Sequence, residues 1–229
     1  MSNLQDQRPR ILWSTNRVEA FSDAVLAIAI TLLVLEIKVD PSEYDHLAHA
    51  LAHEWPAYLA YATSFLTVGS VWIAHHSLFS RLRYIDPMLL RINMMLLLAA
   101  AFLPFPTGVL AQALHSSDRA ERVAIAFYGV TALVIELLLQ AGVRYASAKP
   151  DLMSEQGEGA PLIPEPRRRR NLRTWLSSVV YGAAIAFGIL LFPRASAIAY
   201  LAIAVRGVFV VGDAGRLSLR LPHPHKHDH

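Results

Sequence analysis

The sequence predicts an all-α membrane protein with six transmembrane helices per chain. Of its 229 residues, 54% are hydrophobic and only 17% are charged, whereas about 25% of an ordinary soluble domain is charged. The hydrophobic residues also gather in runs of about 20, the length that an α-helix needs to cross a hydrocarbon core about 30 Å thick. We therefore expect residues 1–229 to form a single transmembrane domain.

Six apolar runs define the predicted spans. They lie at about 18–39, 55–79, 87–111, 121–143, 172–192 and 195–213. The third and fifth are the clearest by hydropathy, while the sixth is short and contains Arg206. No small-residue cleavage site follows the first run, which continues as Glu36-Ile37-Lys38. We interpret this run as a retained helix rather than as a secretory signal peptide.

The positions of lysine and arginine orient the predicted bundle. Positive residues gather before the first span, in the second and fourth connections, and after the sixth span. The other connections hold only Lys38, Arg119, Arg122 and Arg194. Because positive residues mark the cytoplasmic side, an even number of spans is expected, with both termini in the cytoplasm. The predicted location is the cell (inner) membrane.

Two polar segments are expected on the cytoplasmic side. Residues 145–170 are rich in Pro, Gly and Glu and end in four arginines. This composition cannot bury a core and predicts a basic linker close to anionic headgroups. Residues 214–229 form a tail that ends in PHPHKHDH. We interpret this ending as a disordered tail rather than as a metal site, because alternating prolines do not preorganise ligands.

Composition also excludes several classes of function. The chain contains no cysteine, so disulfides, thiolate metal sites and cysteine nucleophiles are impossible. Its pI is about 9.3, but the arginines cluster between apolar segments, which indicates membrane orientation rather than nucleic-acid binding.

The first span carries two chemically different faces if its residues follow the 100° spacing of an α-helix. One face is a stripe of branched apolar residues with one hydroxyl beside them: Ile28, Thr31, Leu32 and Leu35. Asp23 lies about 140° away from Ile28 around the helix. Helical spacing alone leaves open that these faces are ordinary lipid-facing and packing surfaces.

Polar residues inside the spans share a similar depth. By helical rise, all lie within about 15 Å of the cytoplasmic interface. They are Asp23, His75, His76, Asn93, Glu136 and Arg206. Because isolated charges in hydrocarbon are costly, we expect them to pair. Asp23 is expected to accept hydrogen bonds from side chains such as Trp72, His75 or Asn93, and Glu136 to pair with Arg206. We interpret these hydrogen-bonded side chains as a brace, a set of contacts that fixes the first helix in the bundle. A proton relay remains the alternative.

Two further patterns concern packing. Small and hydroxyl residues at steps of three and four along the second span predict close approach of a neighbouring helix. They are Thr63, Thr67, Ser70, Ala74 and Ser77. Pro104 and Pro106 are expected to break or kink the third span near its outer end.

Several motifs in the first half of the chain resemble one family of ion channels. An RxxxFSD motif spans Arg17, Phe21, Ser22 and Asp23, and AIAITLLVLEI follows at 27–37. The second span contains VGSVWIAHHSLF at 68–79, and the third contains Asn93 and FLPFPT at 102–107. Together these segments resemble bacterial members of the transmembrane protein 175 family of potassium channels.

The resemblance implies a homotetramer in which four copies of the first helix line the pore. The TVGYG filter of other potassium channels is absent from this family and from this sequence. The constriction positions of the family fall here on Ile28, Leu32 and Leu35, and its pore threonine falls on Thr31. The implied brace holds the first helix against the second and third. Its members are Arg17, Phe21, Ser22, Asp23, Trp72, His75 and Asn93.

The predicted function is passive cation conduction with modest selectivity for potassium over sodium, and proton passage is left open. The predicted partners are potassium ions, the lipid bilayer and copies of the chain, with no cofactor, no nucleic acid and no enzymatic activity. The alternative is a proton-coupled secondary transporter that uses Asp23, His75, His76 and Glu136. Against it, no two matching halves contain glycine-interrupted helices. An intramembrane enzyme has even less support, because adjacent histidines do not share a helix face.

Overall fold

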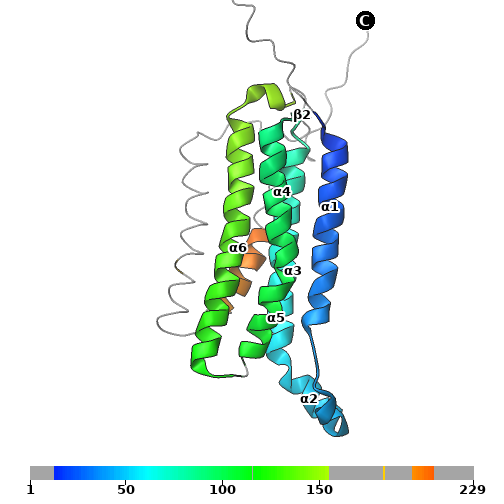
Figure 1. Cartoon of the computed structure of the whole chain (residues 1–229), viewed down its shortest axis with the longest axis vertical. Helices are drawn as coiled ribbons and strands as arrows, with labels where there is room; N and C mark the ends of the chain where they lie inside the picture. The colour runs from blue at the N-terminus through cyan, green and yellow to red at the C-terminus, as the bar shows by residue number, and fades with distance from the viewer. Residues whose placement is uncertain (1–12, 115, 155–182, 184–197, 209–229) are drawn as a thin grey trace, which may run out of the picture.

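The computed structural model describes residues 13–114, 116–154, 183 and 198–208, and this part of the chain is a bundle of long helices (Figure 1). Four helical segments are long and apolar enough to cross a membrane: Thr15–Glu36, Trp55–Phe79, Pro87–Ala113 and Asp118–Ser147. The prediction of an all-α membrane protein is confirmed. The predicted fifth span, 172–192, lies almost entirely outside the described residues. The sixth is described over Ile198–Val208, an apolar helix.

The first span consists of α1 (Thr15–Leu32) followed by one tighter 3-10 turn, η1 (Leu33–Glu36). A short segment that the sequence analysis missed then leads into the second span. It comprises η2 (Pro41–His46), whose first turn is capped by Asp40, and α2 (Leu47–His53). Figure 1 shows α2 at the lower end of the molecule, beyond α5. The second span is α3 (Trp55–Phe79), with the bounds that hydropathy predicted.

The third span is broken into α4 (Pro87–Phe102) and α5 (Pro104–Ala113), with Leu103 between them. The predicted break is confirmed. Proline is tolerated in the first turn of a helix, where no intrahelical N–H bond is needed, but it ends the helix before it. As a result α5 packs against α3, α6 and η1.

The fourth span is α6 (Asp118–Ser147), which is longer than the predicted 121–143. The chain then forms the single turn η3 (Pro150–Leu152), and a β-bridge joins Leu82 to Met153. The predicted linker at 145–170 therefore starts later than expected, because residues 145–154 are folded. Hydropathy does not reveal this closure, since it depends on a few backbone hydrogen bonds such as Arg83 N–H to the carbonyl of Leu152, at 2.8 Å.

A short β-ladder closes the same end of the bundle. Strands β1 (Trp13–Ser14) and β2 (Tyr84–Ile85) pair antiparallel, so the start of α1 is tied to the connection between α3 and α4. Two-residue strands are too short to produce a recognisable sequence period, so they were not predicted.

Asp86, directly after β2, joins α4 to α6. Its carboxylate caps α4 by accepting from Leu89 N–H at 2.9 Å, and it also accepts from the Tyr145 hydroxyl at 2.6 Å and from Lys149 Nζ at 2.8 Å. Burial alone would raise the pKa of Asp86, but these hydrogen bonds and the positive charge of Lys149 outweigh it, and the net shift is downward. The hydrogen bond to Asp86 raises the pKa of Lys149 in turn.

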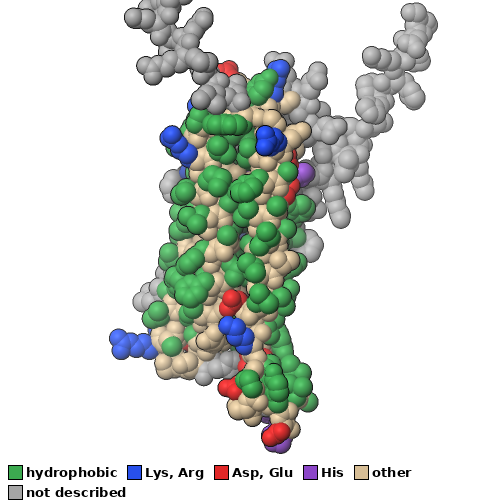
Figure 2. All heavy atoms as spheres, turned by 45° about the vertical axis from the view of Figure 1, so that its right-hand side comes forward, with side chains coloured by type: hydrophobic (Ala, Val, Ile, Leu, Met, Phe, Trp, Pro, Cys, Tyr) green, Lys and Arg blue, Asp and Glu red, His purple; other side chains and the backbone are tan. Residues whose placement is uncertain are grey.

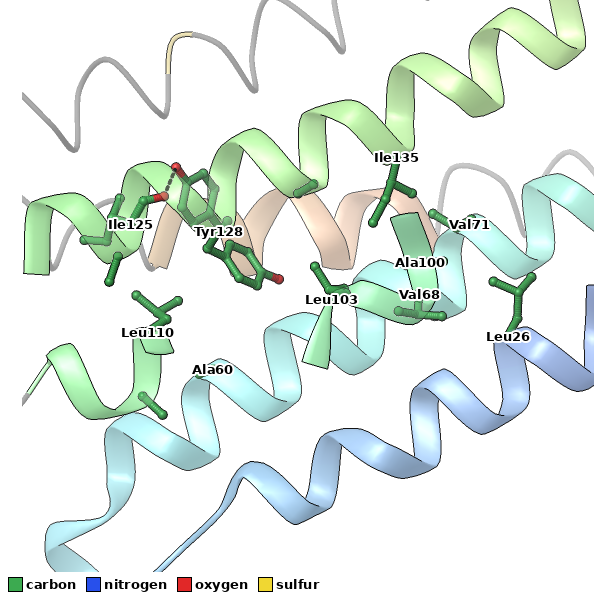
Figure 3. Packing of buried hydrophobic residues seen from close by; sticks show 14 of the residues in the cluster. Leu26, Ala60, Val68, Val71, Ala100, Leu103, Leu110, Ile125, Tyr128 and Ile135 are labelled. Carbon is green, nitrogen blue, oxygen red and sulfur yellow. Dashed lines mark hydrogen bonds between the residues drawn. The ribbon is translucent and has the colours of Figure 1, made fainter. Parts of the chain in front are cut away.

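The main core lies between the long helices. Figure 3 shows Leu26 of α1 beside Val68 and Val71 of α3. Leu26 is fully buried, and Val68 is 1% exposed. The helix Ile198–Val208 also packs closely on α3, because a Cβ atom at Gly207 would lie only 3.0 Å from Ser70 Cβ. Close packing at the small-residue stripe is therefore confirmed at Ser70. On the outer surface, hydrophobic side chains cover the middle of the face in Figure 2, and charged side chains gather toward its two ends.

Candidate functional site

One face of α1 and η1 is left exposed by the part of the chain that the structure describes. Ile28 is 57% exposed, Leu32 42% and Leu35 62%. We call the predicted pore-lining residues the α1 stripe: Ile28, Thr31, Leu32 and Leu35. The opposite face is sealed against the bundle, since Leu26, Ala29 and Leu33 are at most 1% exposed. The structure thus places all four stripe residues together on an open, largely apolar surface.

Thr31 is the polar member of the α1 stripe. Its hydroxyl donates its proton to the carbonyl oxygen of Ile28 at 2.8 Å, within the same helix. Since a hydroxyl has one proton and two acceptor lone pairs, the lone pairs of Oγ1 stay available. Thr31 is also exposed. Its oxygen can therefore accept from water or contact a cation.

The inner part of α1 is tied to α3 and α4 through one chain of buried hydrogen bonds. His75 Nε2 donates to Asn93 Oδ1 at 2.9 Å, and Asn93 Nδ2 donates to Ser22 Oγ at 2.9 Å. The Ser22 hydroxyl in turn donates to the carbonyl of Val18 at 2.8 Å. We assign the proton to His75 Nε2 because the amide oxygen of Asn93 can only accept. All three side chains are at most 4% exposed.

Asp23 belongs to a second, more open contact between α1 and α3. Trp72 Nε1 donates to Asp23 Oδ1 at 3.0 Å. Trp72 is one of the three side chains that the sequence analysis named as candidate donors. The other two candidates do not reach Asp23: His75 donates to Asn93, and Asn93 donates to Ser22. The reason is rotational, since Ser22 and Asp23 point about 100° apart on a helix and only Ser22 faces α4.

A neighbouring pair that the sequence analysis missed lies one turn away. His76 Nδ1 and Glu19 Oε1 are 2.9 Å apart, and the His76 ring stacks on Trp72 with centroids 6.1 Å apart. The spacing in the sequence could have predicted this pair. Glu19 and Asp23 are four residues apart and share one face of α1, and Trp72 and His76 have the same spacing on α3.

The remaining predicted brace residues lie on the surface of the single chain. Phe21 is 51% exposed, and Arg17 is also exposed. They extend the open face of α1 toward its N-terminus rather than packing against α3 or α4. Among the predicted brace residues, the buried contacts therefore come from Ser22, His75 and Asn93.

Glu136 lies on α6, away from these contacts between α1 and its neighbours. Its carboxylate accepts from Gln140 Nε2 at 2.8 Å, one helical turn further along α6. Arg206 lies in the helix Ile198–Val208. The pairing of Glu136 with Arg206 stays a prediction.

A second polar cluster, also missed from sequence, lies deeper in the bundle. The hydroxyls of Ser64 and Thr107 are 2.7 Å apart, and Ser64 also donates to the Tyr128 hydroxyl at 3.2 Å. All three residues are at most 1% exposed. The cluster joins α3, α5 and α6, so it holds α5 in place. Within the described part of the chain, no group of three or more His, Cys, Asp or Glu side chains has the arrangement of a metal site.

Comparison with known proteins decides the family. A sequence profile described as "Endosomal/lysosomal potassium channel TMEM175" matches residues 17–104, which include most of α1 and all of α3 and α4. A potassium channel of Chamaesiphon minutus is 39% identical over 147 residues, 63% of this chain and 71% of that protein. The chain belongs to the TMEM175 family. The family resemblance of the RxxxFSD and neighbouring motifs is therefore confirmed.

Other TMEM175 relatives extend this result. A potassium channel of Streptomyces collinus is 45% identical over 128 residues, and the match spans 56% of this chain and 62% of that protein's length. The human endosomal/lysosomal proton channel TMEM175 is 49% identical over 79 residues, 31% of this chain and 16% of that protein. Among solved structures, a lysosomal potassium-selective channel TMEM175 homolog from Chamaesiphon minutus matches with a TM-score of 0.71 and 30% identity. This match covers 86% of this chain and 97% of that chain.

Proposed function

We propose that this chain is a passive, potassium-selective cation channel whose constriction is formed by copies of α1. The α1 stripe is the observation that supports this proposal. The most apolar 18-residue stretch of the first span has a mean hydropathy of 2.1, close to the 2.0 of Pro87–Ala113 and Asp118–Ser147. Only 22% of this stretch is buried, however, whereas 50% is buried in each of the other two spans. Its open face therefore has room for contacts with other copies of the chain.

A homotetramer is the proposed assembly, as the resemblance to TMEM175 channels implies. Closed cyclic symmetry would bring the same α1 surface of every copy to one axis. The stripe would then face a shared pore rather than lipid, and the bilayer would surround the outer helices. We propose the cell (inner) membrane as its location, with both termini in the cytoplasm. The β1–β2 end of the bundle would then be the cytoplasmic end.

The α1 stripe supports a dewetting constriction. A ring of branched apolar side chains narrows and dries a pore, so an ion must shed water to pass it. Potassium holds its hydration shell less tightly than sodium, and water stripping therefore favours potassium. Thr31 oxygens would replace part of the lost hydration, because their protons are bound to the carbonyl of Ile28. Selectivity should be modest, since no array of carbonyl dipoles replaces the complete shell.

The buried hydrogen-bond chain also argues for a brace rather than a proton relay. The proton on His75 Nε2 is bound by the amide oxygen of Asn93. Asn93 is next in the chain of hydrogen bonds and has no titratable group, so it cannot take up this proton and pass it on. We therefore favour a channel over a proton-coupled transporter that uses Asp23, His75, His76 and Glu136. We propose neither an enzymatic activity nor a cofactor.

A planar bilayer with potassium on one side and sodium on the other tests the function. We expect unitary currents with a reversal potential that favours potassium. Strictly proton-coupled uptake without unitary events would refute a channel and support the transporter. A pH gradient at constant potassium separates proton from potassium conduction. This test is needed because one relative is described as a potassium channel and another as a proton channel.

A further inference from the structure

The 3-10 turn η1 directs one carboxylate back toward the bundle at the outer end of the α1 stripe. Side chains at i and i+3 of a 3-10 helix eclipse one another, so Glu36 lies on the same side as Leu33, which is fully buried. Val34 and Leu35, between them, are 51% and 62% exposed. Glu36 is half-buried. The residue next to the outermost stripe position therefore faces the bundle, while Leu35 faces outward.

Gly108 of α5 receives this carboxylate. A Cβ atom on Gly108 would lie 2.0 Å from Glu36 Oε2 and 2.9 Å from its Cδ. Neither distance is possible for real atoms, so any side chain at position 108 would displace the carboxylate. A hydrogen on the glycine Cα is instead a weak donor to a carboxylate oxygen at close approach. The present position of Glu36 thus requires a glycine at this point in α5.

The support behind Gly108 is rigid. The break at Leu103 sets α5 against η1, and Thr107, directly before Gly108, is 1% exposed and is bonded to Ser64 of α3. Pro104 and Pro106 in the same helix are also buried. A fixed helix with a gap in its side-chain surface therefore lies behind the flexible end of Glu36.

Two other glycines in the long helices offer matched comparisons. A Cβ atom at Gly69 of α3 would meet nothing within 4 Å. At Gly142 of α6 the nearest atom would be Ile92 Cγ2 at 3.7 Å, an ordinary contact distance. Alanine at either position costs little sterically and removes a helix-destabilising glycine. Only Gly108, of these three, touches the pore-lining span.

We propose that Gly108 is a positioning residue for the constriction: it seats the Glu36 carboxylate against α5 and thereby fixes η1 and Leu35. This inference rests on the proposed channel function. Alanine at 108 would displace the carboxylate, and η1 would lose the contact that Glu36 makes with α5. Leu35 would then be held less firmly, and the outermost apolar ring would discriminate less between ions.

Single-channel recordings of the full chain test the proposal. We expect Gly108→Ala to lower the potassium-to-sodium permeability ratio by about twofold or more, because the ratio depends on how tightly the apolar ring is held. Gly69→Ala and Gly142→Ala should conduct like the parent. Glu36→Ala should reproduce the Gly108→Ala effect, and the double variant should equal Glu36→Ala alone. Additive effects, or a parental ratio in Gly108→Ala, would overturn the proposal.

A readout without ion current separates this inference from the proposed function. The chain has no cysteine, so a nitroxide on Leu35→Cys is the only label and reports directly on η1. We expect its spectrum to show greater mobility with Gly108→Ala and no change with Gly69→Ala. If the parent carries no current but the label responds in this way, the channel proposal fails and the Glu36–Gly108 contact stands. An unchanged label would overturn the contact itself.

Discussion

The two halves of the first span, which consists of α1 and η1, are held in opposite ways. The inner half is tied to α3 and α4 by side-chain hydrogen bonds of Ser22, Asp23 and Glu19, at 2.9–3.0 Å. The outer half presents Ile28 and Leu35, which are 57% and 62% exposed. We infer that the polar contacts set the rotation of α1 in the bundle. This rotation leaves the α1 stripe exposed, where it can contact other copies of the chain.

The largest expected effect comes from cutting the buried hydrogen-bond chain. Asn93→Ala removes both hydrogen bonds and leaves Ser22 and His75 buried without this partner, which should cost about 3 kcal/mol of stability. Thermal unfolding of the detergent-solubilised protein measures the loss. Met94→Ala on the same helix, at a 40% exposed position, is the control. Equal melting temperatures for the two variants would show that the brace does not hold α1.

A polar residue in the outer half should alter conduction instead of stability. Ile28→Asn is expected to wet the constriction, so the potassium current rises and discrimination against sodium falls. Planar-bilayer recording measures both quantities. Leu98→Asn, at a 65% exposed position on α4, controls for the cost of an amide on the membrane surface. If both variants conduct like the parent, Ile28 does not belong to the pore.

A smaller loss is expected from the more open of the two inner contacts. Asp23→Ala breaks the single hydrogen bond from Trp72, whose side chain is 43% exposed. A loss of about 1 kcal/mol is expected, because an open donor can turn to water. Thermal unfolding beside Asn93→Ala ranks the two contacts. A loss as large as that of Asn93→Ala would mean that assembly buries Asp23.

Sequence reasoning predicted the features that depend on periodicity. Hydropathy located α3 at its bounds, 55–79, and the helical projection grouped Ile28, Leu32 and Leu35 on the face that the structure leaves open. Proline chemistry predicted the break before Pro104. Each of these follows from local sequence, because a helix converts spacing along the chain into direction in space.

Features that depend on tertiary contacts were not predictable in the same way. The sequence placed Asp23, His75 and Asn93 at one depth, but only the rotation of α1 decides that Ser22, rather than Asp23, meets Asn93. The contact of Glu36 with Gly108 joins residues far apart in the chain. Neither hydropathy nor residue spacing carries information about such pairs.

The smallest effect is expected at the end of the bundle closed by Asp86. A lowered pKa means that the ionised carboxylate favours the folded state. Its contribution is present above the unfolded pKa, close to 3.8, and is lost as the pH falls through the folded value. As the pH falls below about 3.8, the melting temperature of the parent should therefore decrease more steeply than that of Asp86→Asn. Parallel curves for the two proteins from pH 3 to pH 7 would contradict this role.

Cysteine substitution on α1 tests the central claim most directly, because the parent chain contains no cysteine. We expect a cationic methanethiosulfonate reagent to block the potassium current of the Ile28→Cys variant. Leu98→Cys, on the outer surface of α4, should conduct as before after the same treatment. Block at Ile28 alone would place the α1 stripe in the pore. Complete labelling of Ile28→Cys with no change in current would contradict a conduction path along α1.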